Sequence, residues 1–166
     1  MTTRLIFISL CFAIFLMNCG GKEDKKKEGF SYEKKTATEH TVKTAETVPA
    51  SKQVALNNKG VGPITSIELD AEINQDLAAK GEDVYKKMCT ACHRPDKKFI
   101  GPPPTGILER RSPEWIMNMI LNPEGMVQKD PLAKALLIEF NGSPMANQNL
   151  TQEEARAVLE YFRTLK

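Results

Sequence analysis

Cys89-Thr90-Ala91-Cys92-His93 is the stretch of this 166-residue chain that decides its fold and its chemistry. Two cysteines three positions apart can share one helical turn, and histidine follows at once. This spacing is typical of covalent haem attachment, in which each thiol bonds one vinyl group on the same edge of the porphyrin. The next residue then directs its imidazole at the iron. We therefore expect one haem c, with its iron, attached to Cys89 and Cys92 and ligated by His93.

Other uses of these five residues require partners that the sequence lacks. A structural zinc site takes four ligands, usually from two such cysteine pairs, and the chain has no second Cys-x-x-Cys. A thioredoxin-like redox pair needs a strand–helix–strand context, whereas the flanks here have helical periodicity. A disulfide between Cys89 and Cys92 would close a very small loop and would leave His93 unexplained.

The N-terminus predicts export from the cytoplasm. Arg4 precedes an apolar run from Leu5 to Met17, which is short for a membrane span and typical of a secretion signal. The run ends at Asn18-Cys19-Gly20, which resembles a bacterial lipoprotein signal. We therefore expect a signal peptide over residues 1–18 and lipid attachment to Cys19. A plain signal peptide cut nearby, or an uncleaved anchor, is the alternative.

The remaining cysteine and the next segment agree with that prediction. Cys11 would leave with the signal, so none of the four cysteines is left for a disulfide. Residues 19–70 are rich in Lys, Glu and Thr and poor in large apolar side chains, which predicts a flexible polar tether. Within the tether, the piece from Val61 to Ile73 has apolar residues suited to docking on the folded part. We expect an exported protein, anchored by its lipid to a membrane and facing the periplasm.

Residues 71–166 predict a single small all-α domain of about four helices around the haem. Helix-start signals precede each of the four, and no segment alternates as a strand. Asn122-Pro123 is expected to end the second helix, with residues 122–129 forming a loop. The start signals are Asn74 before a helix over residues 75–88, Ser112-Pro113-Glu114, Asp130-Pro131, and the capping box from Thr151 to Glu154.

A second iron ligand is expected far along the chain from His93. Met145 lies between the third and fourth predicted helices, in a loop that Pro144 stiffens. Met126, in the loop over residues 122–129, is the alternative. A thioether ligand is typical of haem proteins that carry electrons.

The charge pattern argues against nucleic acid as a partner. The net charge of the chain is +2, and residues 71–166 hold thirteen basic and thirteen acidic side chains. No basic stripe interrupts this balance, so we expect no nucleic-acid binding.

Residues 71–166 resemble a class I (mitochondrial-type) bacterial cytochrome c. Besides the haem stretch, the resemblance rests on Gly81 and Tyr85, on Ile100-Gly101-Pro102 and on Pro144-Met145. It implies that Gly81 allows a close crossing with the last helix, at Tyr161 or Phe162. It also implies that the carbonyl of Pro102 orients the imidazole of His93.

The same resemblance implies roles for side chains near the haem propionates. The indole N–H of Trp115 would donate to a propionate, with burial in the core as the alternative. Arg110 and Arg111 are further candidates, although exposed arginines are common on any surface.

A haem iron with both axial positions filled has no open site for substrate, so we expect an electron carrier rather than an enzyme. Basic residues near the haem stretch would steer an acidic redox partner, or would serve solubility alone. The donor would be a quinol-oxidising membrane complex and the acceptor a terminal oxidase or exported reductase, such as nitrous oxide reductase. A haem-based ligand sensor or enzyme with an open axial position, and a haem-free interaction lipoprotein, are the alternatives. The basic residues are Lys86, Lys87, Arg94, Lys97 and Lys98.

Overall fold

The computed structural model of the chain describes residues 48–166. This part is all-α, as predicted, and contains no strand beyond an isolated parallel bridge between Ala55 and Arg111. The expected signal peptide, the expected lipid site at Cys19 and the tether up to residue 47 lie outside the described residues. The helices are α2 (Gln75–Met88), the 3-10 helix η1 (Ile107–Glu109), α3 (Pro113–Leu121), α4 (Pro123–Lys129), α5 (Pro131–Glu139) and α6 (Gln152–Thr164).

The predicted helix starts are confirmed. The side chains of Asn74, Ser112 and Asp130 each accept a hydrogen bond from a backbone N–H in the first turn of the helix that follows. Thr151 and Glu154 form both halves of a capping box at the start of α6. Because the first N–H groups of a helix have no partner within it, these side chains fix where each helix begins.

The prediction of a loop over residues 122–129 is wrong, because α4 occupies this segment. Asn122 ends α3 by donating its backbone N–H to the carbonyl of Asn118. The side chain of the same residue accepts from the N–H of Gly125 and so begins α4, with Pro123 at its first position. Asn122, which in the sequence predicts only the end of a helix, therefore also caps the start of the next one.

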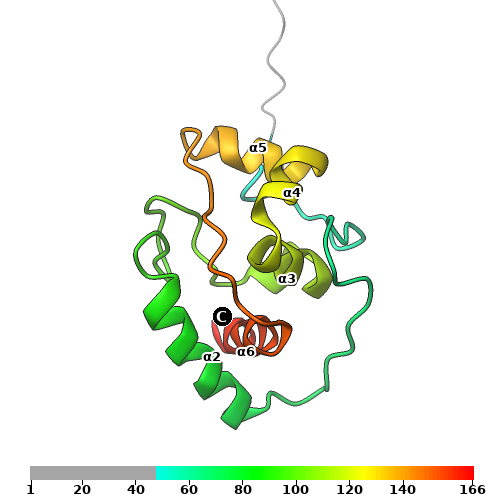
Figure 1. The fold of residues 1–166 in the computed structure, drawn as a ribbon, viewed down its shortest axis with the longest axis vertical. Coiled ribbons are helices and arrows are strands. Elements are labelled where there is room, and N and C mark those ends of the chain that lie inside the picture. The colour runs from blue at the N-terminus through cyan, green and yellow to red at the C-terminus, as the bar shows by residue number, and fades with distance from the viewer. Residues whose placement is uncertain (1–47) are drawn as a thin grey trace, which may run out of the picture. The chain divides into compact units, whose positions relative to one another are not determined.

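Helices α2 and α6 cross at close range in the lower half of Figure 1. Gly81 is buried there, and a Cβ atom at this position would overlap the carbonyl oxygen of Ala157. The partner of Gly81 is therefore the backbone of Ala157 and not the expected Tyr161 or Phe162. Those two rings surround Tyr85 instead, with centroid distances of 5.3 Å and 5.8 Å. The glycine permits the approach, and the aromatic cluster fills the space next to it.

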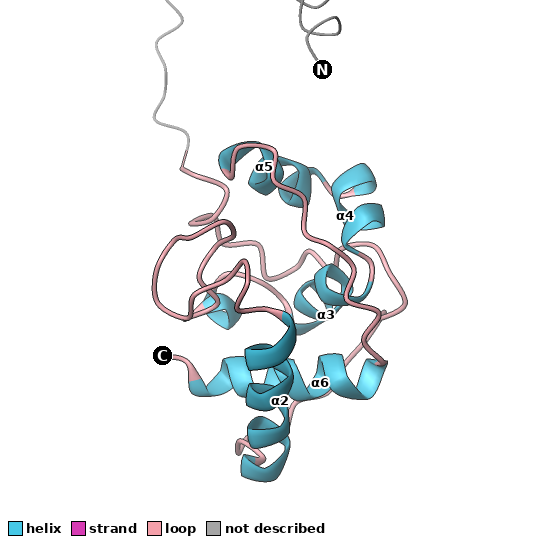
Figure 2. Ribbon diagram, turned by 60° about the vertical axis from the view of Figure 1, so that its left-hand side comes forward, coloured by secondary structure: helices cyan, strands magenta, loops and turns pink. Residues whose placement is uncertain are grey.

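Residues 48–70, which we name the strap, belong to the folded unit. The strap begins beside α5, then passes α4 and α3 and runs down to the start of α2 (Figures 1 and 2). Ala50 and Ile64 are part of the hydrophobic core. The folded unit therefore begins about twenty residues before the predicted boundary at Ala71, and the docking expected for the piece after Val61 extends to the whole strap.

Polar side chains also hold the strap, in addition to the apolar residues that it adds to the core. Asn118 is 1% exposed and makes three hydrogen bonds to the backbone of the strap, one from Ile64 N–H and two to the carbonyls of Lys59 and Ile64. Arg111 donates to the carbonyls of Ala50 and Gln53. Further contacts join Ser112 to Asn58, Asn58 to Asp130, Val61 to Met126 and Asn122, Ser51 to Glu139, and Lys59 to Glu114.

No helix within residues 48–166 has both the length and the apolar character that a bilayer crossing requires.

Candidate functional site

One apolar cavity brings together the residues that the sequence singled out. It encloses about 1390 Å³ of empty space, part of which is open to solvent. Its walls come from the end of α2, the loop that follows it, α3, α5, the loop before α6, and α6 itself. The predicted site residues on these walls are Cys89, Cys92, His93, Pro102, Trp115 and Met145.

The two cysteines and the histidine form a tight turn that continues α2. The N–H of Cys89 donates to the carbonyl of Tyr85, and the N–H groups of Cys92 and His93 both donate to the carbonyl of Cys89. Cys89 is half-buried and Cys92 is exposed, and the structure has no disulfide between them. Burial raises the pKa of the Cys89 thiol to about 11. A thiol in that environment stays protonated, which is unlike the activated thiolate of a redox-active pair.

The ring of His93 is held in one orientation. Its Nδ1 lies 2.8 Å from the carbonyl oxygen of Pro102. Because a carbonyl can only accept, Nδ1 carries the proton and Nε2 keeps a free lone pair. Gly101 lies directly against the ring, where a Cβ atom would overlap Cε1 of His93. The imidazole is therefore prepared to bind a metal through Nε2, with its other nitrogen held by the chain.

The two candidate methionines differ in position. Met145 is half-buried and lines the cavity. Met126 is fully buried and is not part of the lining. Its sulfur lies 3.0 Å from the N–H of Val61 and packs beneath Gly60 of the strap. Met88 and Met119 also line the cavity, and Met119 projects from α3, so it provides a useful comparison for Met145.

Trp115 lines the cavity, but its N–H has a partner other than the expected one. The side chain is 3% exposed, and Nε1 donates to Oδ1 of Asp130 at 3.2 Å. Asp130 also caps α5 and accepts from the side chain of Asn58 at 2.7 Å. The indole N–H therefore ties α3 to the start of α5, and a propionate would have to replace Asp130 to receive it.

Two neighbouring arginines supply positive charge to the cavity wall. Arg111 is 3% exposed and Arg110 is half-buried, and neither forms an ion pair with a described carboxylate within 4 Å. Burial and the nearby charge of Arg110 lower the pKa of Arg111, although a guanidinium remains charged at neutral pH. From the sequence, exposure of both arginines was the alternative to a role at the propionates, because two adjacent arginines do not indicate burial.

Tyr85 is a cavity residue that sequence reasoning identified only as an aromatic of the first helix. Its side chain is 2% exposed, and its hydroxyl is buried without a hydrogen-bond partner among the described residues. Burial raises its pKa to about 12, so the hydroxyl stays protonated. A buried donor without a partner has a cost in stability, which suits a site that receives another molecule.

Taken as a donor set, these residues fit a haem. The apolar walls suit a macrocycle, the two thiols can carry it, and an imidazole nitrogen and a thioether sulfur are both ligands for haem iron. The unpaired arginines suit the carboxylates of such a group.

Comparison with known proteins agrees with this chemistry. The family model for cytochrome c matches residues 78–166. A cytochrome c2 from Rhodopseudomonas palustris is 27% identical over 113 residues, which cover 54% of this chain and 98% of that protein.

Solved structures give the same result. A cytochrome c from Rhodothermus marinus is 44% identical, with a TM-score of 0.61 over 63% of this chain and 89% of that one. An engineered form of that cytochrome, solved with a bound carbene intermediate, is 43% identical, with a TM-score of 0.58 over 63% of this chain and 89% of that one.

Proposed function

Since the chain belongs to the cytochrome c family, as a class I bacterial domain with covalently bound haem c and its iron, we propose that Cys89 and Cys92 form its two thioether bonds. The protein is a haem-based electron carrier. Both sulfurs lie on one turn at the end of α2, on the wall of the same cavity. That arrangement supports attachment along a single edge of the haem.

We propose His93 and Met145 as the two iron ligands. Haem iron supplies the chemistry, a change of one electron between Fe(III) and Fe(II). Nε2 of His93 is free to bind, because Pro102 accepts the proton on Nδ1. Met145 is the one of the two predicted candidates that lines the cavity. A neutral thioether favours the reduced state and raises the reduction potential.

The other cavity residues hold and tune the group. The proposed role of Pro102 is to fix the imidazole ring and strengthen its basicity through the 2.8 Å hydrogen bond. The proposed role of Arg111 is to balance the charge of a propionate, because its buried guanidinium forms no ion pair with a carboxylate of residues 48–166. Trp115 keeps α3 and α5 in place through Asp130.

Electrons would enter and leave at the haem edge beside the attachment turn. Met88, Phe99 and Ile100 are between 38% and 46% exposed there, and Cys92 is exposed as well. We name these four residues the haem-edge face. Basic side chains flank it and support weak docking with an acidic redox partner, although Lys86 is paired with Glu82 at 2.9 Å and Asp96 lies among the others in sequence. The flanking residues are Lys86, Lys87, Arg94, Lys97 and Lys98.

We propose that this carrier works outside the cytoplasm while anchored by lipid on Cys19. The lipoprotein-like signal in the sequence supports this placement, and covalent haem attachment outside the cytoplasm agrees with it. Its donor would be a quinol-oxidising membrane complex. Its acceptor would be a terminal oxidase or an exported reductase, such as nitrous oxide reductase.

The observation that carries the proposal is the presence of His93 and Met145 on one cavity with the attachment cysteines. Absorption spectra of both oxidation states test it, recorded with and without carbon monoxide. Two filled axial positions give low-spin spectra that carbon monoxide leaves unchanged. Met145→Ala should abolish the near-infrared band of sulfur-to-iron bonding, whereas Met119→Ala should retain it. Persistence of the band in Met145→Ala would refute the assignment of this ligand.

A second candidate function is ligand binding at an axial position opened by loss of Met145. The loop over residues 141–149 carries this side chain, and most of its residues are exposed. An engineered relative has been solved with a carbene intermediate bound. Rapid binding of carbon monoxide to the unmodified protein would favour this function over electron transfer alone.

A further inference from the structure

We propose that the strap and α5 form a second docking face, which contacts an anionic membrane surface. The large exposed apolar side chains of residues 48–166 divide into two groups. One group is the haem-edge face. The other consists of Val48, Val54, Leu56 and Ile138, which are between 51% and 71% exposed. We name this second group, together with the lysines described below, the strap face.

The strap is joined to both ends of α5. Ser51 donates both its backbone N–H and its hydroxyl to the carboxylate of Glu139, at the end of α5. Asn58 donates to Asp130, at the start of α5. The strap therefore passes from one end of this helix to the other, beside α5 at the top of Figures 1 and 2.

The charge of the strap face suits anionic headgroups. Lys52, Lys129 and Lys134 are exposed. Lys134 lies one turn before Ile138, on the same side of α5. Within residues 48–60 and 129–139, the acidic groups are Asp130, which is buried with three donors, and Glu139, which accepts two hydrogen bonds from Ser51. The exposed Glu68, Asp70 and Glu124 lie outside these two ranges. The charge presented outward is therefore positive, which favours an anionic lipid surface.

The residue types distinguish this face from a protein interface. Protein interfaces are enriched in aromatic residues, Met and Arg and are poor in Lys. The haem-edge face has that composition, with Phe99 and Met88, and with the guanidinium of Arg94 over the ring of Phe99 at 4.2 Å. The strap face instead has aliphatic side chains and lysines, the combination found on helices and loops that lie at membrane surfaces.

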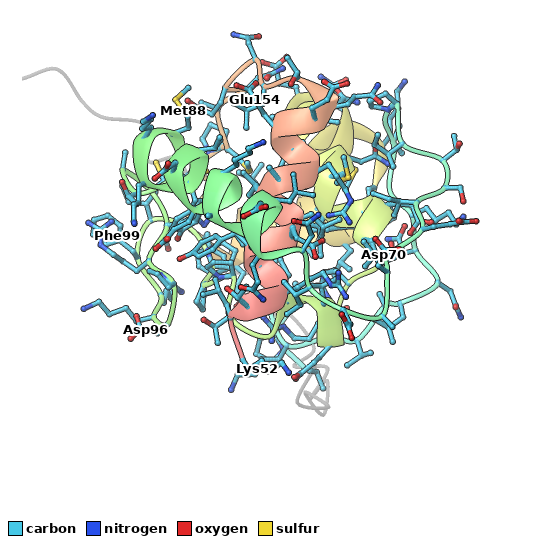
Figure 3. The ribbon with its side chains drawn as sticks, turned by 90° about the horizontal axis from the view of Figure 1, so that it is seen from below. Lys52, Asp70, Met88, Asp96, Phe99 and Glu154 are labelled. Carbon is cyan, nitrogen blue, oxygen red and sulfur yellow. The ribbon has the colours of Figure 1, made fainter. Side chains whose placement is uncertain are left out.

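The position of the strap face along the chain also favours a membrane as the surface that it contacts. The described part begins at Val48, which is itself a member of the face, and the proposed lipid site lies upstream at Cys19. This last step rests on the proposed lipid anchor, whereas the composition and the charge do not. In Figure 3, Met88 lies at the upper left, Phe99 at the left edge and Lys52 at the lower edge. The haem-edge face and the strap face are distinct groups of residues, and Lys98, whose Nζ lies 4.6 Å from the ring centroid of Phe140, joins the haem-edge loop to the end of α5.

Hydrogen exchange of the full-length holoprotein tests the proposal. The protein is mixed with vesicles of phosphatidylglycerol and phosphatidylcholine, with vesicles of phosphatidylcholine alone, and with buffer. We expect exchange over residues 48–60 and 131–139 to slow several-fold on the anionic vesicles only, and high salt to reverse the effect. Residues 86–100 should exchange alike in all three conditions. The protein is added to preformed vesicles, so the result requires no lipid on Cys19.

Matched variants distinguish docking through the strap face from docking through the haem-edge face. Ile138→Asp should lose the protection by anionic vesicles, and Phe99→Asp, at the most exposed large apolar residue of the haem-edge face, should retain it. Equal protection on both kinds of vesicle, or protection over residues 86–100 instead, would overturn the proposal. Slower exchange of the strap in buffer alone as protein concentration rises would also overturn it, because it would assign the face to a second copy of the chain. Electron transfer to a soluble acceptor should stay unchanged in Ile138→Asp. If the docking proposal is overturned, the electron-carrier function is therefore unaffected.

Discussion

The α2–α6 crossing and the strap are stabilised in opposite ways. At the crossing, Gly81 lies against the backbone of Ala157, and Tyr85 packs between two aromatic rings. The strap contains no helix, and side chains such as Asn118 and Arg111 satisfy its backbone groups. Close packing tolerates almost no added volume, whereas a polar attachment depends on retaining each hydrogen-bond partner.

The largest expected effect breaks the crossing. Gly81→Val places atoms inside the backbone of Ala157, so α2 and α6 must separate. We expect a loss of about 3 kcal/mol in the free energy of unfolding, at the upper end for overpacking. Denaturant unfolding of the holoprotein followed by circular dichroism measures it. Ala79→Ser, on the exposed side of the same helix, is the control and should leave the midpoint in place. A Gly81→Val midpoint equal to that of the control would disprove the tight crossing.

The next effect releases the strap and leaves the crossing intact. Asn118→Leu keeps a similar volume but removes all three hydrogen bonds to Lys59 and Ile64. Unsatisfied backbone groups are costly, so we expect a loss of about 2 kcal/mol. Hydrogen exchange should rise over residues 58–66 while α2 and α6 stay protected. The exposed Asn147→Leu serves as the control. Equal loss of protection in strap and helices would show that the two regions unfold as one.

A third effect concerns the joint between the two regions. Glu160 of α6 accepts the N–H of Asn74, just before α2, and pairs with Arg156 and Arg163. Burial would raise the pKa of this carboxyl, but the hydrogen bonds from Arg156 and Asn74 and the charges of both arginines outweigh it, and the pKa is lowered. The stabilisation is therefore present above the unfolded pKa of about 4.3 and is lost as pH falls through the folded pKa.

Glu160→Gln should accordingly cost about 1.5 kcal/mol near neutral pH, where charged hydrogen bonds are lost. The difference from the unmodified protein should shrink as the pH is lowered. Urea unfolding at several pH values measures it. Glu153→Gln, exposed at the start of the same helix, is the comparison. A difference that stays constant with pH would contradict the lowered pKa.

The smallest expected effect loosens one end of the strap. Ser51→Ala removes the hydroxyl contact to Glu139 but retains the backbone N–H contact to the same carboxylate. One hydrogen bond of this kind contributes about 0.5 to 1 kcal/mol. Limited proteolysis should cleave near Val48 faster in this variant, with little change in the unfolding midpoint. An unaltered cleavage rate would show that the backbone contact suffices.

The two regions also differ in how far the sequence could predict them. The starts of four helices could be predicted from their N-cap residues, because capping depends only on residues close together in the sequence. These helices are α2, α3, α5 and α6, with the caps Asn74, Ser112, Asp130 and Thr151. The strap has no such signal. Its partners lie 54 to 93 positions further along the chain, and polar side chains such as Asn118 do not reveal in sequence that they will be buried.

The same contrast applies to the site. Pro102 could be named because its neighbours resemble a known pattern, and the structure places its carbonyl 2.8 Å from His93. The hydrogen-bond partner of Trp115 could not be predicted, because Asp130 reaches the indole only when α3 and α5 are folded together. The unpaired hydroxyl of Tyr85 could not be predicted either, since lack of a partner is a property of the packed molecule.

Helix α6 has a consequence for the order in which the protein matures. Glu160 of α6 accepts a hydrogen bond from Asn74, 86 positions earlier in the chain, and Arg163 donates to the carbonyl of Asp70, 93 positions earlier. Gly81 packs against the backbone of the same helix. A chain that is exported as proposed emerges N-terminus first, so α6 arrives after α2. Until it arrives, α2 has no partner, and we expect Cys89 to remain accessible to the machinery that joins thiols to haem. A chain that stops at Asn149 should accordingly accept reagents for thiols at Cys89 as readily as an unfolded peptide does.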